Sequence, residues 1–195
     1  MRNRDENKEL MIREKAIAMI VNEGFDGLSM QKLAKEVNIS ASTIYIYFKN
    51  REDLLNKLYM GVQEKFEKDA LTGFSPEMSF ADGLWLQWKN RLKNINQHPV
   101  AYQFYEQFRN SPLINHEDIK PATFRKAMND FFSNAIKRGE IKDLSPELYW
   151  AIAYGPFYTL VRFHLSNANM AGTAFSLTEK KLKKALELVL AALAA

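Results

Sequence analysis

The 195-residue sequence contains no cysteine, only eight glycines and six prolines, and no apolar run that could cross a bilayer. The missing thiols exclude disulfides, thiolate nucleophiles, thiolate zinc sites and iron–sulfur ligation. The longest apolar stretches are Trp150–Val161 and Leu188–Ala195, well short of the roughly 20 residues of a transmembrane helix. The polar N-terminus also lacks the apolar core of a secretory signal. We therefore expect a soluble, cytoplasmic protein with no membrane partner.

The sequence also lacks the patterns that mark common catalytic sites. It has no glycine-rich phosphate loop and no His-Glu-x-x-His motif. Asn115-His116-Glu117-Asp118 is the one local cluster with metal-ligand chemistry, and its position between turn signals is more typical of an acidic helix N-terminus. We therefore predict no catalytic residues, no cofactor and no metal. A net charge of +4 permits a polyanionic partner without requiring one.

Apolar residues recur at helical spacing, with hardly any alternating strand pattern, which predicts an all-α fold of about nine helices. In residues 8–23 the apolar positions are Ile12, Ala16, Met19 and Ile20, and Gly24 ends the segment. Later helices are expected over residues 51–69, 79–96, 99–110, 117–138, 145–166 and 175–194. Gly155-Pro156 lies inside one of them and predicts a kink, because proline removes a backbone hydrogen bond.

Two short segments after Gly24 form a helix-turn-helix pattern. Ser29 is placed to cap Met30–Val37, and Ser40 is placed to cap Ala41–Tyr47. Asn38 stands in the turn between them, where asparagine tolerates a left-handed conformation. In such pairs the second helix enters the major groove of DNA with its N-terminal residues toward the base edges.

The residue types along this segment suit DNA contact. Small and hydroxyl-bearing residues allow close approach and bond phosphate or base edges, phenols add long donors, and basic residues neutralise phosphates. The simpler alternatives are that Tyr45 is partly packed in the core and that Lys49 and Arg51 are only solvated surface charges. The predicted DNA-binding residues are Ser29, Gln31, Ser40, Ala41, Ser42, Thr43, Tyr45, Tyr47, Lys49 and Arg51.

Residues 12–55 resemble the DNA-binding head of the TetR/AcrR family of transcriptional regulators. The matches lie at fixed spacing over about 45 residues: Gly24-Phe25, Ser29-Met30, Leu33-Ala34, Thr43-Ile44-Tyr45, and Phe48 with Arg51-Glu52. Asn38 and Ser42 stand where the family usually has glycine, which leaves the target sequence open. The rest of the chain is similar in length and helical layout only.

The resemblance implies a DNA-binding head over residues 1–55, which the helix 51–69 links to a body over residues 70–195. It further implies a homodimer that binds a pseudo-palindromic operator, acts as a repressor and is released by a small, largely apolar effector. A different class of function, a helical carrier or sensor of hydrophobic molecules that does not bind DNA, is the alternative.

The body holds 18 of the 24 aromatic residues, which is compatible with a tightly packed core or with a ligand cavity. The candidate ligand-binding residues are Trp85, Trp88, Tyr102, Tyr105, Glu106, Phe124, Tyr154 and Tyr158. A leucine-rich stripe near the C-terminus, Leu182 to Leu193, either completes the core or meets its copy in a dimer. By resemblance, the helices 145–166 and 175–194 form the dimer interface.

Overall fold

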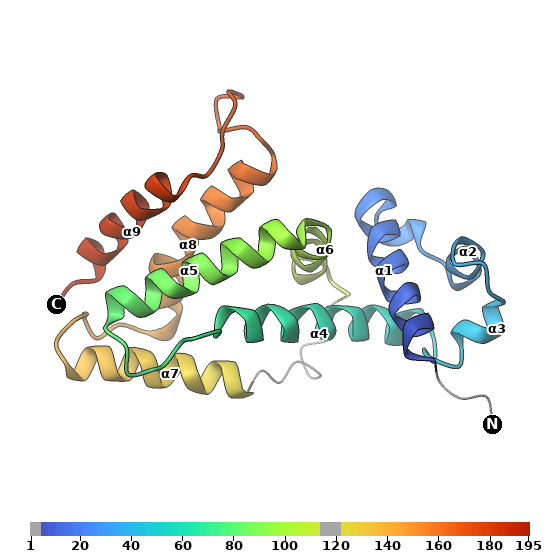
Figure 1. Cartoon of the computed structure of the whole chain (residues 1–195), viewed down its shortest axis with the longest axis horizontal. Coiled ribbons are helices and arrows are strands. Elements are labelled where there is room, and N and C mark those ends of the chain that lie inside the picture. Colours follow the sequence, from blue (N-terminus) through green and yellow to red (C-terminus); the bar gives the residue numbers. More distant parts are fainter. Residues whose placement is uncertain (1–4, 114–121) are drawn as a thin grey trace. The chain divides into compact units, whose positions relative to one another are not determined.

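The computed structural model describes residues 5–113 and 122–195, and these form two compact units. The first unit contains residues 5–66 and 98–113, and the second contains residues 67–97 and 122–195. Within the described residues the secondary structure is nine α-helices and one short 3-10 turn, with no strand (Figure 1). The predicted all-α class is therefore confirmed.

The first unit begins with α1 (Glu6–Glu23), η1 (Phe25–Gly27), α2 (Met30–Glu36) and α3 (Ala41–Ile44). Asp5 caps α1 by accepting a hydrogen bond from the Lys8 amide. Gly24 ends α1 with φ of 76°, a conformation in which glycine avoids the strain of a side chain. α4 (Arg51–Ala70), which belongs to this unit as far as Phe66, and α6 (Pro99–Arg109) follow.

The core of the first unit joins the short helices to α4 and α6. Ile12, Leu33, Ile44 and Phe48 are fully buried in it, and Phe108 of α6 lies in the same cluster. The Phe25 and Phe108 rings meet edge to face, with centroids 5.9 Å apart. By packing, α6 thus belongs with the helix-turn-helix, although it lies in the predicted body by sequence position.

The second unit is built from α5 (Phe80–Gln97), α7 (Ala122–Lys137), α8 (Pro146–Leu165) and α9 (Glu179–Leu193). α5 contacts each of the other three, and α8 and α9 lie side by side (Figure 1). The leucine-rich stripe of α9 faces inward: Leu182, Leu186, Val189 and Leu193 are all buried. In this chain the stripe therefore completes the core of the second unit.

The predicted helix boundaries agree with the observed ones to within a few residues, with two informative differences. The predicted helix Ala41–Tyr47 is α-helical only to Ile44, because the amides of Ile46 and Tyr47 bond three residues back, to Thr43 and Ile44. α9 begins at Glu179, where Thr178 supplies the cap, rather than at residue 175. α8 continues through Pro156, and its predicted kink stays a prediction.

The cluster Asn115-His116-Glu117-Asp118 and the first residues of the predicted helix 117–138 lie outside the described residues. In the described part of the chain, no helix combines the length and apolar character that a bilayer crossing requires.

Candidate nucleic-acid interface and ligand site

The helix-turn-helix is fixed by its two serine caps and its turn. The Ser29 hydroxyl accepts from the Lys32 amide, and the Ser40 hydroxyl accepts from the Thr43 amide at 3.2 Å. Asn38 adopts φ of 55°, which confirms the predicted left-handed turn. The Asn38 and Ile39 amides bond back to Lys35 and Ala34, so the carbonyls at the end of α2 are satisfied by a Schellman arrangement.

The predicted DNA-binding residues divide into an exposed and a buried set. The exposed ones are Ser29, Gln31, Ser40, Ser42, Tyr45 and Lys49, and the Tyr45 side chain is 52% exposed. Thr43 and Tyr47 are 8% and 5% exposed, and Ala41 and Arg51 are half-buried. Whether any of the ten contacts DNA stays a prediction.

Two of the less exposed residues have roles inside the first unit. Arg51 donates to the main-chain carbonyls of Leu28 and Phe25, so its guanidinium ties the start of α4 to the loop before α2. The Tyr47 phenol accepts a hydrogen bond from the Asp5 amide at 3.2 Å. These contacts join segments 23 to 42 residues apart, so local spacing could not predict them.

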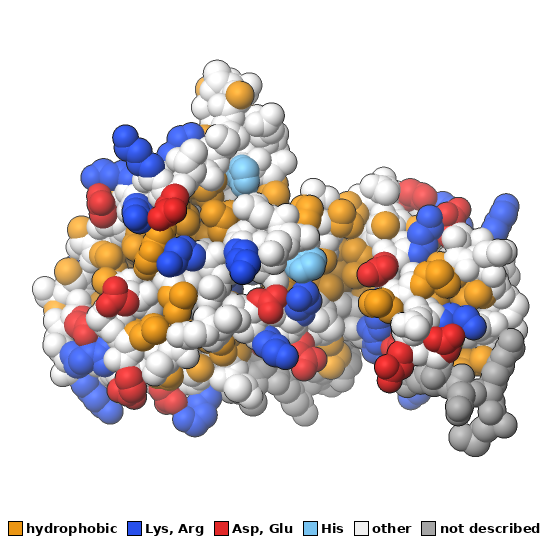
Figure 2. Space-filling model, viewed as in Figure 1, with side chains coloured by type: hydrophobic (Ala, Val, Ile, Leu, Met, Phe, Trp, Pro, Cys, Tyr) orange, Lys and Arg blue, Asp and Glu red, His pale blue; other side chains and the backbone are white. Residues whose placement is uncertain are grey.

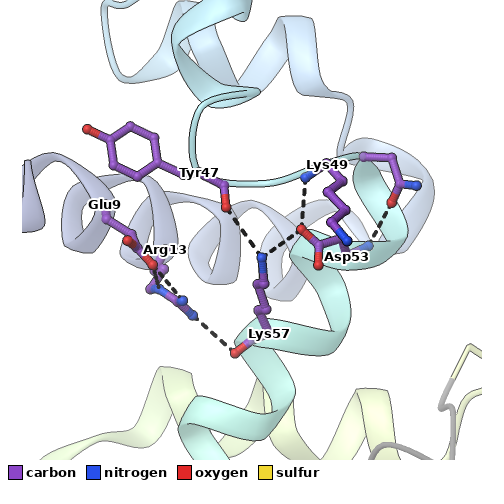
Figure 3. Close-up of polar contacts among 7 residues, drawn as sticks. Glu9, Arg13, Tyr47, Lys49, Asp53 and Lys57 are labelled. Carbon is purple, nitrogen blue, oxygen red and sulfur yellow. Dashed lines mark hydrogen bonds and ion pairs between the residues drawn. The ribbon is translucent and has the colours of Figure 1, made fainter. Parts of the chain in front are cut away.

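A pair of charged residues on α4 holds the end of the recognition segment, which we define as residues 40–49 (Figure 3). Asp53 accepts from the Lys49 amide at 2.8 Å and pairs with the Lys57 ammonium at 2.9 Å. Lys57 also donates to the Tyr47 carbonyl, and Arg13 of α1 donates to the Lys57 carbonyl at 3.0 Å. The Arg13 and Lys57 cations both lie over the Phe48 ring.

These contacts change the pKa of the Asp53 carboxyl. Burial raises the pKa of its carboxyl, but the hydrogen bonds from Lys57 and the Lys49 amide outweigh that effect and lower the pKa below its ordinary value. The Asp53 carboxylate is thus engaged both with the Lys49 amide and with the Lys57 ammonium. Sequence reasoning missed Asp53 and Lys57, although their spacing of four residues on a helix is the signal of such a pair.

The head carries little net charge, with 10 Lys and Arg against 9 Asp and Glu in residues 1–60. Both signs are interspersed on the face of the molecule shown in Figure 2. Lys15 pairs with Glu36, and Lys32 pairs with Glu23. Lys35 and Lys49 are exposed and enter no ion pair among the described residues, so they are the cations most accessible to a phosphate.

The candidate ligand residues fall into both units. In the second unit, Phe124, Tyr154 and Tyr158 surround Arg91 of α5, whose guanidinium lies 5.4 Å from the Phe124 centroid and 5.0 Å from the Tyr154 centroid. Arg91 donates to the Tyr158 hydroxyl at 2.8 Å. Sequence reasoning missed Arg91, although an arginine in helical register with Leu84, Trp88 and Ile95 was a usable signal.

Buried polar contacts adjoin this cluster. The Tyr154 hydroxyl donates to the fully buried Gln87 at 2.8 Å, and Trp88 donates to the Ala153 carbonyl at 3.0 Å. Burial raises the pKa of Tyr154 well above its ordinary value, so its phenol stays protonated. Trp85 has different neighbours, because the ammonium groups of Lys89 and Lys183 both lie over its ring.

The other candidate ligand residues belong to α6 in the first unit. Tyr105 stacks on Tyr59 with ring centroids 5.2 Å apart, and Tyr102 stacks on Phe66. Burial raises the pKa of Glu106, and the charge of Arg109 only partly offsets this rise. A surface hollow of about 390 Å³ is lined by Pro76, Thr123, Lys126, Ala127 and Asp130, none of which was predicted to bind ligand.

Comparison with known proteins relates the helix-turn-helix to a described family. Residues 12–58 match the family model described as bacterial regulatory proteins, tetR family. An HTH-type transcriptional regulator of Haemophilus influenzae is 30% identical over 135 residues, which cover 69% of this chain and 71% of the relative. The fatty acid metabolism regulator protein of Bacillus subtilis is 24% identical over 139 residues, covering 70% and 72%.

The likeness also holds over the whole fold. The crystal structure of a TetR family transcription regulator from Marinobacter aquaeolei superposes with a TM-score of 0.77 at 24% identity. The match covers 100% of this chain and 99% of that chain, so the helical body shares the fold as well as the helix-turn-helix.

Proposed function

Because the chain belongs to the tetR family of bacterial regulatory proteins and is a DNA-binding transcriptional regulator, we propose that it represses transcription as an effector-released homodimer. The two heads would occupy successive major grooves of a pseudo-palindromic operator, roughly 34–36 Å apart. The effector would bind more tightly to the protein conformation that has the weaker affinity for DNA. Only a ligand that binds two conformations unequally shifts the equilibrium between them.

The observation that carries the DNA part of the proposal is the division of the recognition segment into two faces. Ser42, Tyr45 and Lys49 are exposed, whereas Ile44, Tyr47 and Phe48 are buried in the first-unit core. The exposed side chains supply a hydroxyl, a phenol and an ammonium, which are donors for phosphates and base edges.

Selection from a random duplex pool tests DNA recognition directly. Enriched duplexes are expected to contain two half-sites related by a pseudo-two-fold axis, and the affinity should fall as salt rises, because phosphate contacts release counterions. The protein's own upstream region is the natural second probe in a gel-shift assay. A folded protein that enriches and retards no duplex at low salt would contradict the proposal and favour the hydrophobic-ligand carrier.

We place the dimer interface on the outer faces of α8 and α9. The leucine-rich stripe of α9 is buried in the core of the second unit, but other apolar residues of α8 and α9 are exposed. Leu148 is 49% exposed and Leu188 is 63% exposed, and Ala191 and Ala192 are also exposed, near Leu188 in the sequence. Apolar residues on adjacent exposed helix faces are suited to an isologous two-fold contact.

A charge placed in this interface should separate the subunits. For Leu188→Glu we expect monomers in sedimentation analysis and at least a tenfold loss of operator affinity, because each monomer holds one half-site. Met170→Glu is the matched control, since Met170 is 91% exposed and lies between α8 and α9. An intact Leu188→Glu dimer would show that the subunits meet elsewhere.

For the effector, the proposed site is the cluster of Trp88, Phe124, Tyr154 and Tyr158 in the second unit. Aromatic walls with a few placed polar groups are typical of small-molecule sites. The name of the Bacillus subtilis relative makes acyl compounds the first probes to try. Effector binding should change the tryptophan fluorescence of the protein, and Tyr158→Phe should weaken effector binding. If wild type, Tyr158→Phe and Tyr154→Phe all give the same fluorescence response, the effector site lies elsewhere.

A further inference from the structure

The exposed face of the recognition segment has one apolar member. Ser42 of α3 and three residues that follow this helix, Tyr45, Ile46 and Lys49, are all exposed, and together we call them the exposed face of the segment. Three of the four side chains end in a hydroxyl or an ammonium. Ile46 has no polar atom, and it is 44% exposed.

Contacts with the residue three positions before Ile46, and of the two residues after it, keep Ile46 in this exposed position. Its amide donates to the Thr43 carbonyl at 3.2 Å. The next two residues, Tyr47 and Phe48, are anchored in the first-unit core, and the Tyr47 carbonyl is bonded by Lys57. Ile46 cannot turn inward without displacing these residues. A β-branched side chain is also stiff, so it presents a defined surface.

The chemistry of the major groove restricts what an aliphatic side chain can recognise there. Each base pair presents hydrogen-bond donors and acceptors, and the C5-methyl group of thymine is the apolar feature of the groove. The hydroxyl groups of Ser42 and Tyr45 and the Lys49 ammonium, on the same face, would bond the polar edges and phosphates around that methyl.

We propose that Ile46 is a specificity-determining residue that contacts the C5-methyl group of a thymine in each half-site. The inference rests on the proposed DNA-binding function and names a feature of its target. Ile46 was absent from the DNA contacts predicted from the sequence, and it becomes a candidate because the structure exposes it.

The experiment combines a substitution that shortens the Ile46 side chain with a base replacement that removes the thymine methyl group from the DNA. The probe is the consensus duplex enriched by wild type from a random pool, with each thymine replaced singly by uracil, which differs only in lacking the methyl. At one thymine per half-site the replacement should raise the Kd of wild type roughly three- to tenfold. For Ile46→Ala the same replacement should change the Kd less than about twofold.

Two further variants separate contact from structure. Ile46→Val keeps a β-branched aliphatic side chain and should retain the dependence on the thymine methyl. Ser42→Ala alters the same face and should retain it as well. The melting temperature of Ile46→Ala should match that of wild type, because the side chain lies outside the core.

The possible outcomes distinguish this inference from the proposed function. If no duplex is enriched, the proposed function fails, and the inference fails with it. If a duplex is enriched but no uracil replacement matters, or Ile46→Ala keeps the full dependence of wild type, the Ile46 contact alone is overturned.

Discussion

At the scale of single residues, the first unit depends on groups whose conformation or bonding is unusual. Asn38 is the clearest case, because its φ of 55° carries the chain from α2 to α3. Asparagine tolerates the left-handed region better than other side chains, but glycine occupies it without strain. The left-handed conformation of Asn38 therefore costs a small amount of free energy, and substitutions at this position can raise or remove that cost.

Substitution of Asn38 should change stability in opposite directions for two small residues. We expect Asn38→Ala to lower the free energy of unfolding by about 1 kcal/mol, since alanine is strained at positive φ. Asn38→Gly should leave it unchanged or raise it slightly. Urea unfolding of the three proteins measures the difference. If alanine proved as stable as glycine at this position, the left-handed turn would be wrong.

Sequence patterns predicted residues whose structural role is local and missed those whose role depends on distant partners. The caps at Ser29 and Ser40 and the left-handed Asn38 follow from neighbours within a few positions, and all three are confirmed. The burial of Tyr47 and the main-chain bonds of Arg51 depend on segments far along the chain. Tertiary packing of this kind leaves no periodic signal.

At the scale of elements, α4 controls the end of the recognition segment through Asp53 and Lys57. Asp53 bonds the Lys49 amide and Lys57 bonds the Tyr47 carbonyl, so two adjacent helical turns fix both sides of Phe48. A change in the position of these turns would alter how Tyr45 and Lys49 are presented. This contact is a direct mechanical link from α4 to the proposed DNA interface.

Removal of the Asp53–Lys57 pair should weaken operator binding. Lys57→Met should raise the operator Kd roughly three- to tenfold, the effect of one hydrogen bond of about 1 kcal/mol, while Lys57→Arg should retain most of the affinity. Equal affinities of wild type and Lys57→Met would show that the pair does not position the segment.

The pH dependence follows from the lowered pKa of Asp53. A carboxyl whose pKa is lower in the folded state stabilises the fold above its unfolded pKa, near 3.9, and loses this contribution as the pH falls through the folded pKa. The stability difference between wild type and Asp53→Asn should therefore be constant from pH 7 to 5 and shrink in more acidic solution. Urea unfolding across that range measures it, and a difference that grew on acidification would contradict the assignment.

The contact of α5 with α7 depends on a glycine that sequence analysis did not single out. A Cβ atom at Gly83 would lie 2.6 Å from the Phe131 ring, which is fully buried and packed against Phe74 and Phe80. The ring has no room to move, so the two helices approach each other only because residue 83 has no side chain.

Alanine at two helical glycines should therefore have opposite effects. Gly83→Ala should lower the free energy of unfolding by about 1–3 kcal/mol through overpacking. In Gly61→Ala the new methyl would meet only Arg13 at 3.8 Å, and the variant should gain about 0.5–1 kcal/mol from reduced backbone entropy. Denaturant unfolding compares them, and a Gly83→Ala protein as stable as wild type would contradict the close packing.

At the scale of the whole molecule, the described chain divides its residue types between two units with different proposed roles. The first unit places a small exposed face of hydroxyl, phenol, aliphatic and ammonium groups on a firmly packed core. The second unit surrounds a half-buried arginine with aromatic rings and exposes apolar residues on α8 and α9. The nearly neutral charge of the head means that DNA recognition would depend on position more than on bulk charge.

The most direct test of the account is the affinity of wild type and of the double variant Tyr45→Ala/Lys49→Ala for the enriched duplex and a scrambled duplex. Both side chains are exposed, so the variant should melt like wild type. Wild type should bind the enriched duplex at least about 10³-fold more tightly than the scrambled one. The double variant should lose roughly 100-fold or more on the enriched duplex, with a shallower salt dependence. Unchanged affinity of the folded variant would contradict the assignment of this face to DNA.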